Sequence, residues 1–147
     1  MVLMKARVLE FHKDRTQRMF DRIELDCMAV GGRVERKVEK DGTHSLTCIL
    51  REPRELTVSI HPFVFYRVIW LDGLIPKEPY MFSKNTVEEV AIHAEGCDYA
   101  EISNVFTKTY EPSSGMEFEV KGKFRGFRIK YNPMKKKMEI DLLKELG

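Results

Sequence analysis

The sequence lacks the signatures of several large protein classes. No apolar run approaches the roughly 20 residues that a membrane-spanning helix needs. It contains no G-x-S-x-G nucleophile motif, no P-loop and no G-x-G-x-x-G motif. We therefore expect no contact with a membrane and no nucleotide cofactor, and the absence of these motifs disfavours an enzyme.

Cysteine is scarce and poorly spaced for a disulfide framework. The three cysteines, Cys27, Cys48 and Cys97, are far apart and form no C-x-x-C pair. An odd number of scattered cysteines is typical of structural thiols in a reducing compartment. We therefore expect a cytoplasmic protein whose cysteines behave as small buried hydrophobes.

Two His–Cys pairs invite a metal interpretation. His93 and Cys97 are four residues apart, as are His44 and Cys48. Zinc needs three or four converging ligands, and these pairs are expected on different kinds of element. A Cys97–His93 nucleophile is also disfavoured, because a thiolate is stabilised at a helix N-terminus and this cysteine follows an expected helix end. We expect no metal site and no catalytic residue.

Asparagine and glutamine are also rare, at four residues in total. Combined with a charged fraction of 33%, this bias resembles the composition of hyperthermophile proteins, although three Cys and eight Met point the other way. The length of 147 residues and the hydrophobic fraction of 43% fit one globular domain covering residues 1–147.

The longest apolar run, residues 55–71, is expected to organise the fold. Leu56, Val58 and Ile60 alternate with polar residues, which is the pattern of a half-buried strand. The second half is apolar on both faces except for Arg67, and Pro62 should mark a bulge, bend or tight turn between the halves.

Two helices are expected. The first follows a strand over residues 3–11, begins near Asp14, presents an apolar stripe and stops at Gly31-Gly32. The stripe consists of Phe20, Ile23, Cys27 and Val30, with Met19 beside it. The second is expected from Asn85 to Gly96, with Val87, Val90, Ala91 and Ala94 facing inward.

The remaining segments favour strands. A type I′ turn is expected at Asp41-Gly42, after a charged edge strand, and a further turn at residues 51–54. Strands are also expected at 116–121, 123–131 and 136–142, interrupted at Gly122 and at Asn132-Pro133. The order β-α-β-β-β-β-α-β-β-β-β indicates an α+β fold with both helices on one face of a largely antiparallel curved sheet.

Charge is distributed unevenly along the chain. Residues 121–137 hold eight of the 25 basic residues and none of the 23 acidic ones. Alternation would put cations and aromatic rings together on an exposed strand, where cations meet phosphates and rings stack on unpaired bases. We therefore expect a nucleic-acid-binding protein, with RNA or single strands preferred. The expected contacts are Lys121, Lys123, Arg125, Arg128 and Lys130 for phosphate, and Phe127 and Tyr131 for bases.

Three other interpretations remain open. The basic segment can be a solvated hairpin whose rings face the core. Arg67 can be the single polar group of a cavity that binds a small carboxylate ligand. The chain can also be an assembly module, or a homodimer, that pairs through exposed sheet edges.

Overall fold

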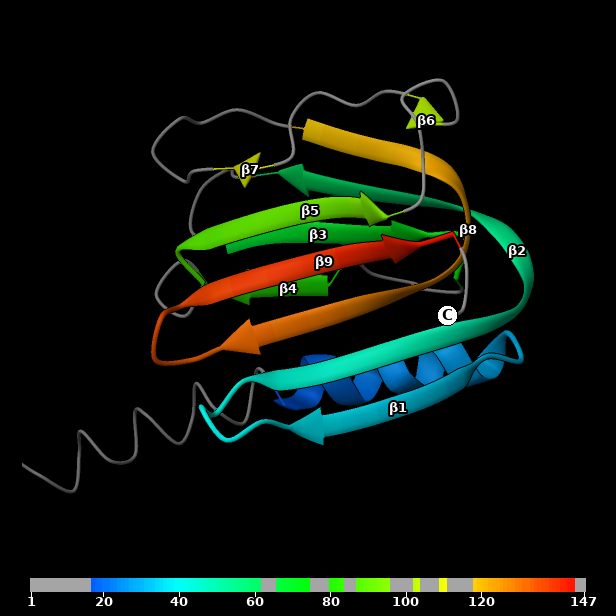
Figure 1. Cartoon of the computed structure of the whole chain (residues 1–147). Coiled ribbons are helices and arrows are strands. Elements are labelled where there is room, and N and C mark those ends of the chain that lie inside the picture. The colour runs from blue at the N-terminus through cyan, green and yellow to red at the C-terminus, as the bar shows by residue number, and fades with distance from the viewer. Residues whose placement is uncertain are drawn as a thin grey trace, which may run out of the picture.

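One helix packs on a mixed, mostly antiparallel sheet in an α+β domain (Figure 1). The computed structural model describes residues 17–61, 66–74, 80–83, 87–95, 102–103, 109–110 and 118–144. The helix covers 17–29. The strands are β1 (Arg33–Val38), β2 (His44–His61), β3 (Tyr66–Asp72), β4 (Tyr80–Ser83), β5 (Glu89–Glu95), β6 (Ile102–Ser103), β7 (Thr109–Tyr110), β8 (Phe118–Asn132) and β9 (Lys137–Leu143).

Five neighbouring strands carry the helix, in the order β1-β2-β8-β9-β5. All neighbours in this set are antiparallel except β5 and β9, which run parallel. The other half of β2 pairs with β3, and β3 pairs with β4. The five-stranded sheet is not strongly curled, so the expected curved sheet is confirmed only as a mostly antiparallel one. The bending is concentrated in the long strands β2 and β8 (Figure 1).

The first predicted helix is confirmed over its described part. Phe20, Ile23 and Cys27 are buried in the core, and Met19 and Val30 pack partly buried against it. The helix ends as predicted: Gly31 has φ of 81°, its amide donates to the Met28 carbonyl, and the Gly32 amide donates to the Cys27 carbonyl. This is a Schellman end, in which glycine takes the left-handed conformation without steric cost. The expected strand 3–11 and Asp14 lie outside the described residues.

The expectation of free thiols is wrong for two cysteines. Cys27 of the helix and Cys48 of β2 form a disulfide with a Cα–Cα distance of 6.1 Å. Both were correctly expected in the core, but sequence spacing does not reveal that the helix and β2 bring them face to face. Gly32 makes room for the pair, since a Cβ at this position would lie 2.6 Å from Cys27 Sγ. Cys97 lies outside the described residues.

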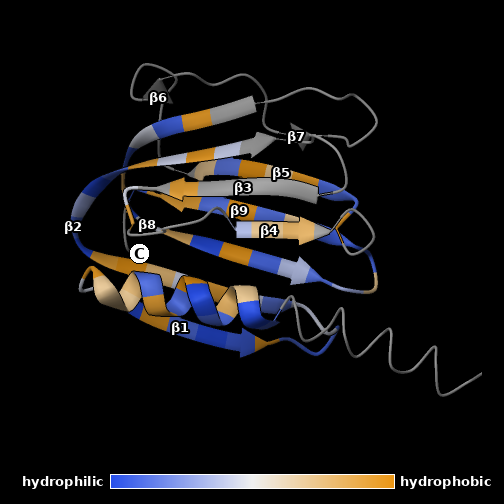
Figure 2. Ribbon diagram, turned by 180° about the vertical axis from the view of Figure 1, so that it is seen from behind, coloured by the Kyte–Doolittle hydropathy of each residue, from blue (hydrophilic) through white to orange (hydrophobic). Residues whose placement is uncertain are grey.

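The β1–β2 hairpin is confirmed, but its turn is not type I′. The Gly42 amide donates to the Glu39 carbonyl at 3.0 Å, and Gly42 has φ of 87° while Asp41 does not have positive φ. This is a type I turn followed by a left-handed glycine, the usual longer hairpin loop. β1 is the expected charged edge strand: it is exposed except at Val34, and Figure 2 colours it mostly as hydrophilic.

The predicted central run lies in two strands, β2 and β3, in agreement with the expected break between its halves. Its described parts are extended, as expected, and Leu56, Val58 and Leu71 are buried. Residues 60–61 of β2 pair with Val68 and Ile69 of β3, so the halves form an antiparallel hairpin around the undescribed 62–65. The turn predicted at 51–54 is wrong: β2 continues through it, with an irregularity in its register against β8 between Ile49 and Arg54.

The second predicted helix is wrong, because residues 89–95 form strand β5. Val90 and Ala94 fit both a helical stripe and an alternating strand, so they do not separate the two. Ile92 does: it is 1% exposed, whereas the predicted helix left it off the inward stripe. Pairing of β5 with β9 over its full length decides the conformation, and tertiary context commonly overrides local propensity in this way.

The C-terminal strands agree with the prediction except at Gly122. β8 runs unbroken through this glycine, which pairs with Leu56. The predicted turn at Asn132-Pro133 is confirmed, and β9 is the predicted final strand. Within the described part of the chain, no helix has the length and apolar character needed to cross a membrane.

Candidate functional site

The basic segment 121–137 lies at the centre of the sheet and at one of its turns. It consists of most of β8, the turn 133–136 and the first residue of β9. β8 is flanked by β2 on one side and β9 on the other. Its side chains therefore divide between a core face, covered by the helix, and the opposite face of the sheet, called here the outer face.

The two rings expected to stack on bases belong to the core. Phe127 is fully buried and Tyr131 is 4% exposed, on the same face as Ile129. Their β2 partners are Cys48, Leu46 and His44, whose face also packs toward the helix. The assignment of Phe127 and Tyr131 as base-stacking residues is therefore wrong: alternation identified their shared face, but sequence alone assigned that face to the ligand instead of the core.

Arg128 and Lys130 lie on the outer face of β8. Both are half-buried, and the Arg128 Nε donates a hydrogen bond to Thr47 Oγ1 at 3.0 Å. Thr47 and Ser45, their partners on β2, are themselves almost fully buried, at 7% and 4% exposure. The outer face of β2 and β8 is therefore a polar surface of hydroxyls and cations.

Cross-strand register continues this polar surface across all five strands. One row aligns Glu35 of β1, Thr47 of β2, Arg128 of β8, Asp141 of β9 and His93 of β5. The next row aligns Lys37, Ser45, Lys130, Glu139 and Ala91. The cations of these rows lie on β1 and β8, and the carboxylates of Glu139 and Asp141 lie on β9, next to β8. Sequence reasoning missed these rows, because they depend on which strands become neighbours.

The other three predicted phosphate contacts are separated from this pair along β8. Lys121 forms an ion pair with Glu55 at 3.0 Å, and Lys123 is exposed. Arg125 is half-buried, and its Nε is buried with no hydrogen-bond partner. The structure thus brings Arg128 and Lys130 together with the hydroxyls of β2, whereas the other three predicted cations lie further along β8.

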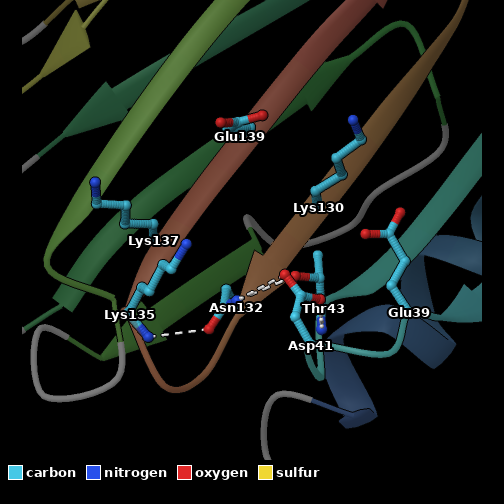
Figure 3. Close-up of a pocket in the computed structure, with 8 residues that line it drawn as sticks. All are labelled: Glu39, Asp41, Thr43, Lys130, Asn132, Lys135, Lys137 and Glu139. Carbon is cyan, nitrogen blue, oxygen red and sulfur yellow. Dashed lines mark hydrogen bonds between the residues drawn. The ribbon is translucent and has the colours of Figure 1, made fainter.

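A pocket of about 280 Å³ opens where the β1–β2 and β8–β9 turns meet (Figure 3). Lys130 links it to the outer face. Its charges are balanced between ammonium and carboxylate groups. The lining residues are Glu39, Asp41, Thr43, Lys130, Asn132, Lys135, Lys137 and Glu139.

Asn132 holds the two turns in place at this pocket (Figure 3). Its Oδ1 accepts hydrogen bonds from the Met134 and Lys135 amides, and its Nδ2 donates to Thr43 Oγ1. Asp41 accepts a bond from the Thr43 amide, and hydrogen bonding to Thr43 lowers the pKa of the Asp41 carboxyl. The pocket is therefore a fixed junction whose carboxylate at Asp41 stays ionised at neutral pH.

The structure describes only the backbone at Arg67, the alternative site for a small carboxylate ligand. Arg67 lies in β3, with Phe82 of β4 as its backbone partner, and its side chain is outside what the structure describes. The His44–Cys48 metal pair is excluded as a thiolate site in this oxidised form, because Cys48 is bonded to Cys27 and His44 stacks on Phe20.

No protein-family model, curated protein or solved structure matches this chain.

Proposed function

We propose that the protein binds nucleic acid through its sugar–phosphate backbone, using the outer face of β2 and β8. The single observation that carries this proposal is that Arg128 and Lys130 lie next to each other on the outer face, beside the buried hydroxyls of Thr47 and Ser45. Guanidinium, ammonium and hydroxyl donors are the groups that contact phosphate oxygens in protein–nucleic acid complexes.

The hydrogen bond from Arg128 to Thr47 supports this assignment. It holds one edge of the guanidinium, at Nε, against the sheet. The terminal nitrogens of the same side chain carry the planar pair of donors that suits phosphate. A side chain held in this way loses less conformational entropy when it binds than a free surface arginine does.

The proposal differs from the sequence expectation in one respect. Burial of Phe127 and Tyr131 removes the stacking rings that favoured single strands over duplex. Phosphate contact alone positions a nucleic acid and carries no base sequence. We therefore propose binding without sequence preference, with Lys121, Lys123 and Arg125 contributing to the attraction along the rest of β8.

The test is the salt dependence of binding. Log K should fall linearly with log salt, with a slope of about −0.7 per neutralised phosphate for single strands and about −0.9 for duplex. Changing Arg128 and Lys130 together to Gln should weaken binding and flatten the slope by about 1.4 for a single-stranded oligonucleotide. The measurement is fluorescence anisotropy with labelled oligonucleotides across a salt series.

A charge-matched control separates local contact from general attraction. Changing Arg18 and Arg51 to Gln removes the same charge; both are exposed, Arg18 on the helix and Arg51 beside the helix end at Gly31. This control should leave the salt slope unchanged. Equal effects of the two double variants, or no binding at low salt, would exclude the proposed face.

A further inference from the structure

Three metal-ligating side chains meet on the outer face, on strands β5 and β9, away from β1. Glu139 and Asp141 are two residues apart on β9 and share a face, and His93 of the parallel strand β5 is the backbone partner of Asp141. The imidazole nitrogen and one oxygen of each carboxylate all lie within 4.8 Å of one another. His93 precedes Glu139 by 46 positions in the chain (139 − 93), so the cluster is invisible in the sequence.

The kind of ligand selects the kind of metal. Imidazole with carboxylate suits zinc and other divalent transition metals, whereas magnesium and calcium prefer oxygen ligands alone. Zinc lies about 2.0–2.2 Å from nitrogen and oxygen ligands, so two ligand atoms of a tetrahedral site lie roughly 3.3–3.6 Å apart. The three ligand atoms, which lie within 4.8 Å of one another, would therefore have to close in by about 1 Å when the metal binds. Three protein ligands leave one position open to water, as in zinc sites that are not purely structural.

The surroundings of Asp141 also favour a cation. Asp141 is 5% exposed, which is unusual for a carboxylate that lies on the face of a sheet away from the apolar core. A buried carboxylate is compensated by positive charge or hydrogen bonds, and Asp141 already has an interaction partner within the protein, which a metal ion would have to join or displace. Arg128 and Lys130 of β8 are the backbone partners of Asp141 and Glu139. Their cationic side chains therefore compete with a metal ion for the two carboxylates.

We propose that His93, Glu139 and Asp141 form a three-ligand site for a divalent transition-metal ion, with Zn²⁺ preferred. The rigid β5–β9 pair fixes the spacing of the ligands, and the open position faces the solvent side of the sheet. This proposal is independent of nucleic-acid binding, since neither the ligands nor the test involves a nucleic acid.

The test is direct metal binding to the untagged, chelator-treated protein. Isothermal titration with ZnCl₂ should give one site, and Co²⁺ should give the visible absorption bands of a site with nitrogen and oxygen ligands. Glu139→Gln and His93→Gln should each weaken Zn²⁺ binding by at least about tenfold, since losing even an outer partner of a ligand typically costs 10–100-fold.

Glu89→Gln is the matched control. Glu89 lies on the same face of β5 as His93, forms an ion pair with Lys137 and is not a member of the cluster. The Glu89→Gln variant should bind Zn²⁺ with the affinity of the wild type. Glu139 is exposed, so Glu139→Gln should keep the wild-type circular dichroism spectrum. Absence of a stoichiometric site, or equal affinity in Glu139→Gln and Glu89→Gln, would overturn the proposal.

Discussion

At the scale of single residues, Asp26 connects the helix to strand β4. The Tyr80 hydroxyl donates to Asp26 Oδ2 at 2.5 Å, and Arg22 Nε lies 4.0 Å from the same oxygen. The Arg22 guanidinium also lies over the Tyr80 ring, 4.8 Å from its centre. Tyr80 is 1% exposed, so its hydroxyl is satisfied inside the core by a charged acceptor. Removing that hydroxyl tests how much this contact contributes.

Tyr80→Phe should lower the free energy of unfolding by roughly 1.5–3 kcal/mol, the usual range for a hydrogen bond to a charged group. The ring remains and fills the same space, so the loss reports on the hydroxyl. Urea unfolding at neutral pH, followed by circular dichroism, measures it. Tyr131→Phe is not a suitable control, because Tyr131 makes a contact of its own in the core. A change below about 0.5 kcal/mol would mean that water replaces the lost partner.

The same contact predicts a pH dependence. Burial and the hydrogen bond to Asp26 raise the pKa of Tyr80 far above its usual range. The unfolded tyrosine ionises near pH 10, so above that pH the unfolded state loses a proton that the folded state keeps. The stabilising contribution is full below pH 10 and is lost progressively above it. The stability difference between wild type and Tyr80→Phe should therefore narrow from pH 9 to pH 11.

At the scale of elements, strand β5 offers a sharp test of the fold. Ile92 faces the core and Ala91 faces the outer side, half-buried. Ile92→Lys should destabilise the protein by more than about 4 kcal/mol, because it buries an unpaired charge. Ala91→Lys should be tolerated, since its backbone partner on β9 is Glu139. Thermal unfolding of the two variants measures the contrast, and a helix with Ala91 inward would give the reverse order.

Local sequence patterns predicted the elements whose conformation depends little on the strands that pair with them. The helix was predictable because its apolar stripe and its Gly31-Gly32 end are encoded within 14 residues. The β1–β2 hairpin and the β8–β9 turn were predictable for the same reason. β5 was not, because Val90 and Ala94 suit either conformation and only the pairing with β9 decides between them. For the candidate site, the cations of β8 were identified from sequence, but the burial of its rings was not.

At the scale of the whole molecule, the Cys27–Cys48 disulfide cross-links the helix to the sheet. It closes a loop across a sequence separation of 21 residues. Such a loop restricts the unfolded chain and should contribute about 3 kcal/mol by the chain-entropy relation. Urea unfolding of the wild type with and without reductant should show this difference. A titration of thiols in the unfolded, non-reduced protein should find one thiol per chain instead of three.

The variant Cys27→Ser/Cys48→Ser supplies the control for reductant. It lacks both sulfurs of the cross-link, so reductant should leave its stability unchanged. Equal stability of the reduced and oxidised wild type would show that the bond joins residues that the rest of the core already holds together.

The central position of β8 also constrains how the protein is made. β2 is synthesised early, but the edge that faces β8 lacks its partner until residues 118–132 have been added. β5 likewise lacks its parallel partner until β9, the last strand along the described chain, has been synthesised. Such long-range pairings are slow to form, and unpaired strand edges attract other chains. A ribosome making this protein therefore exposes an incomplete sheet until β8 and β9 have been synthesised, and residues 118–143 complete the sheet of the described domain.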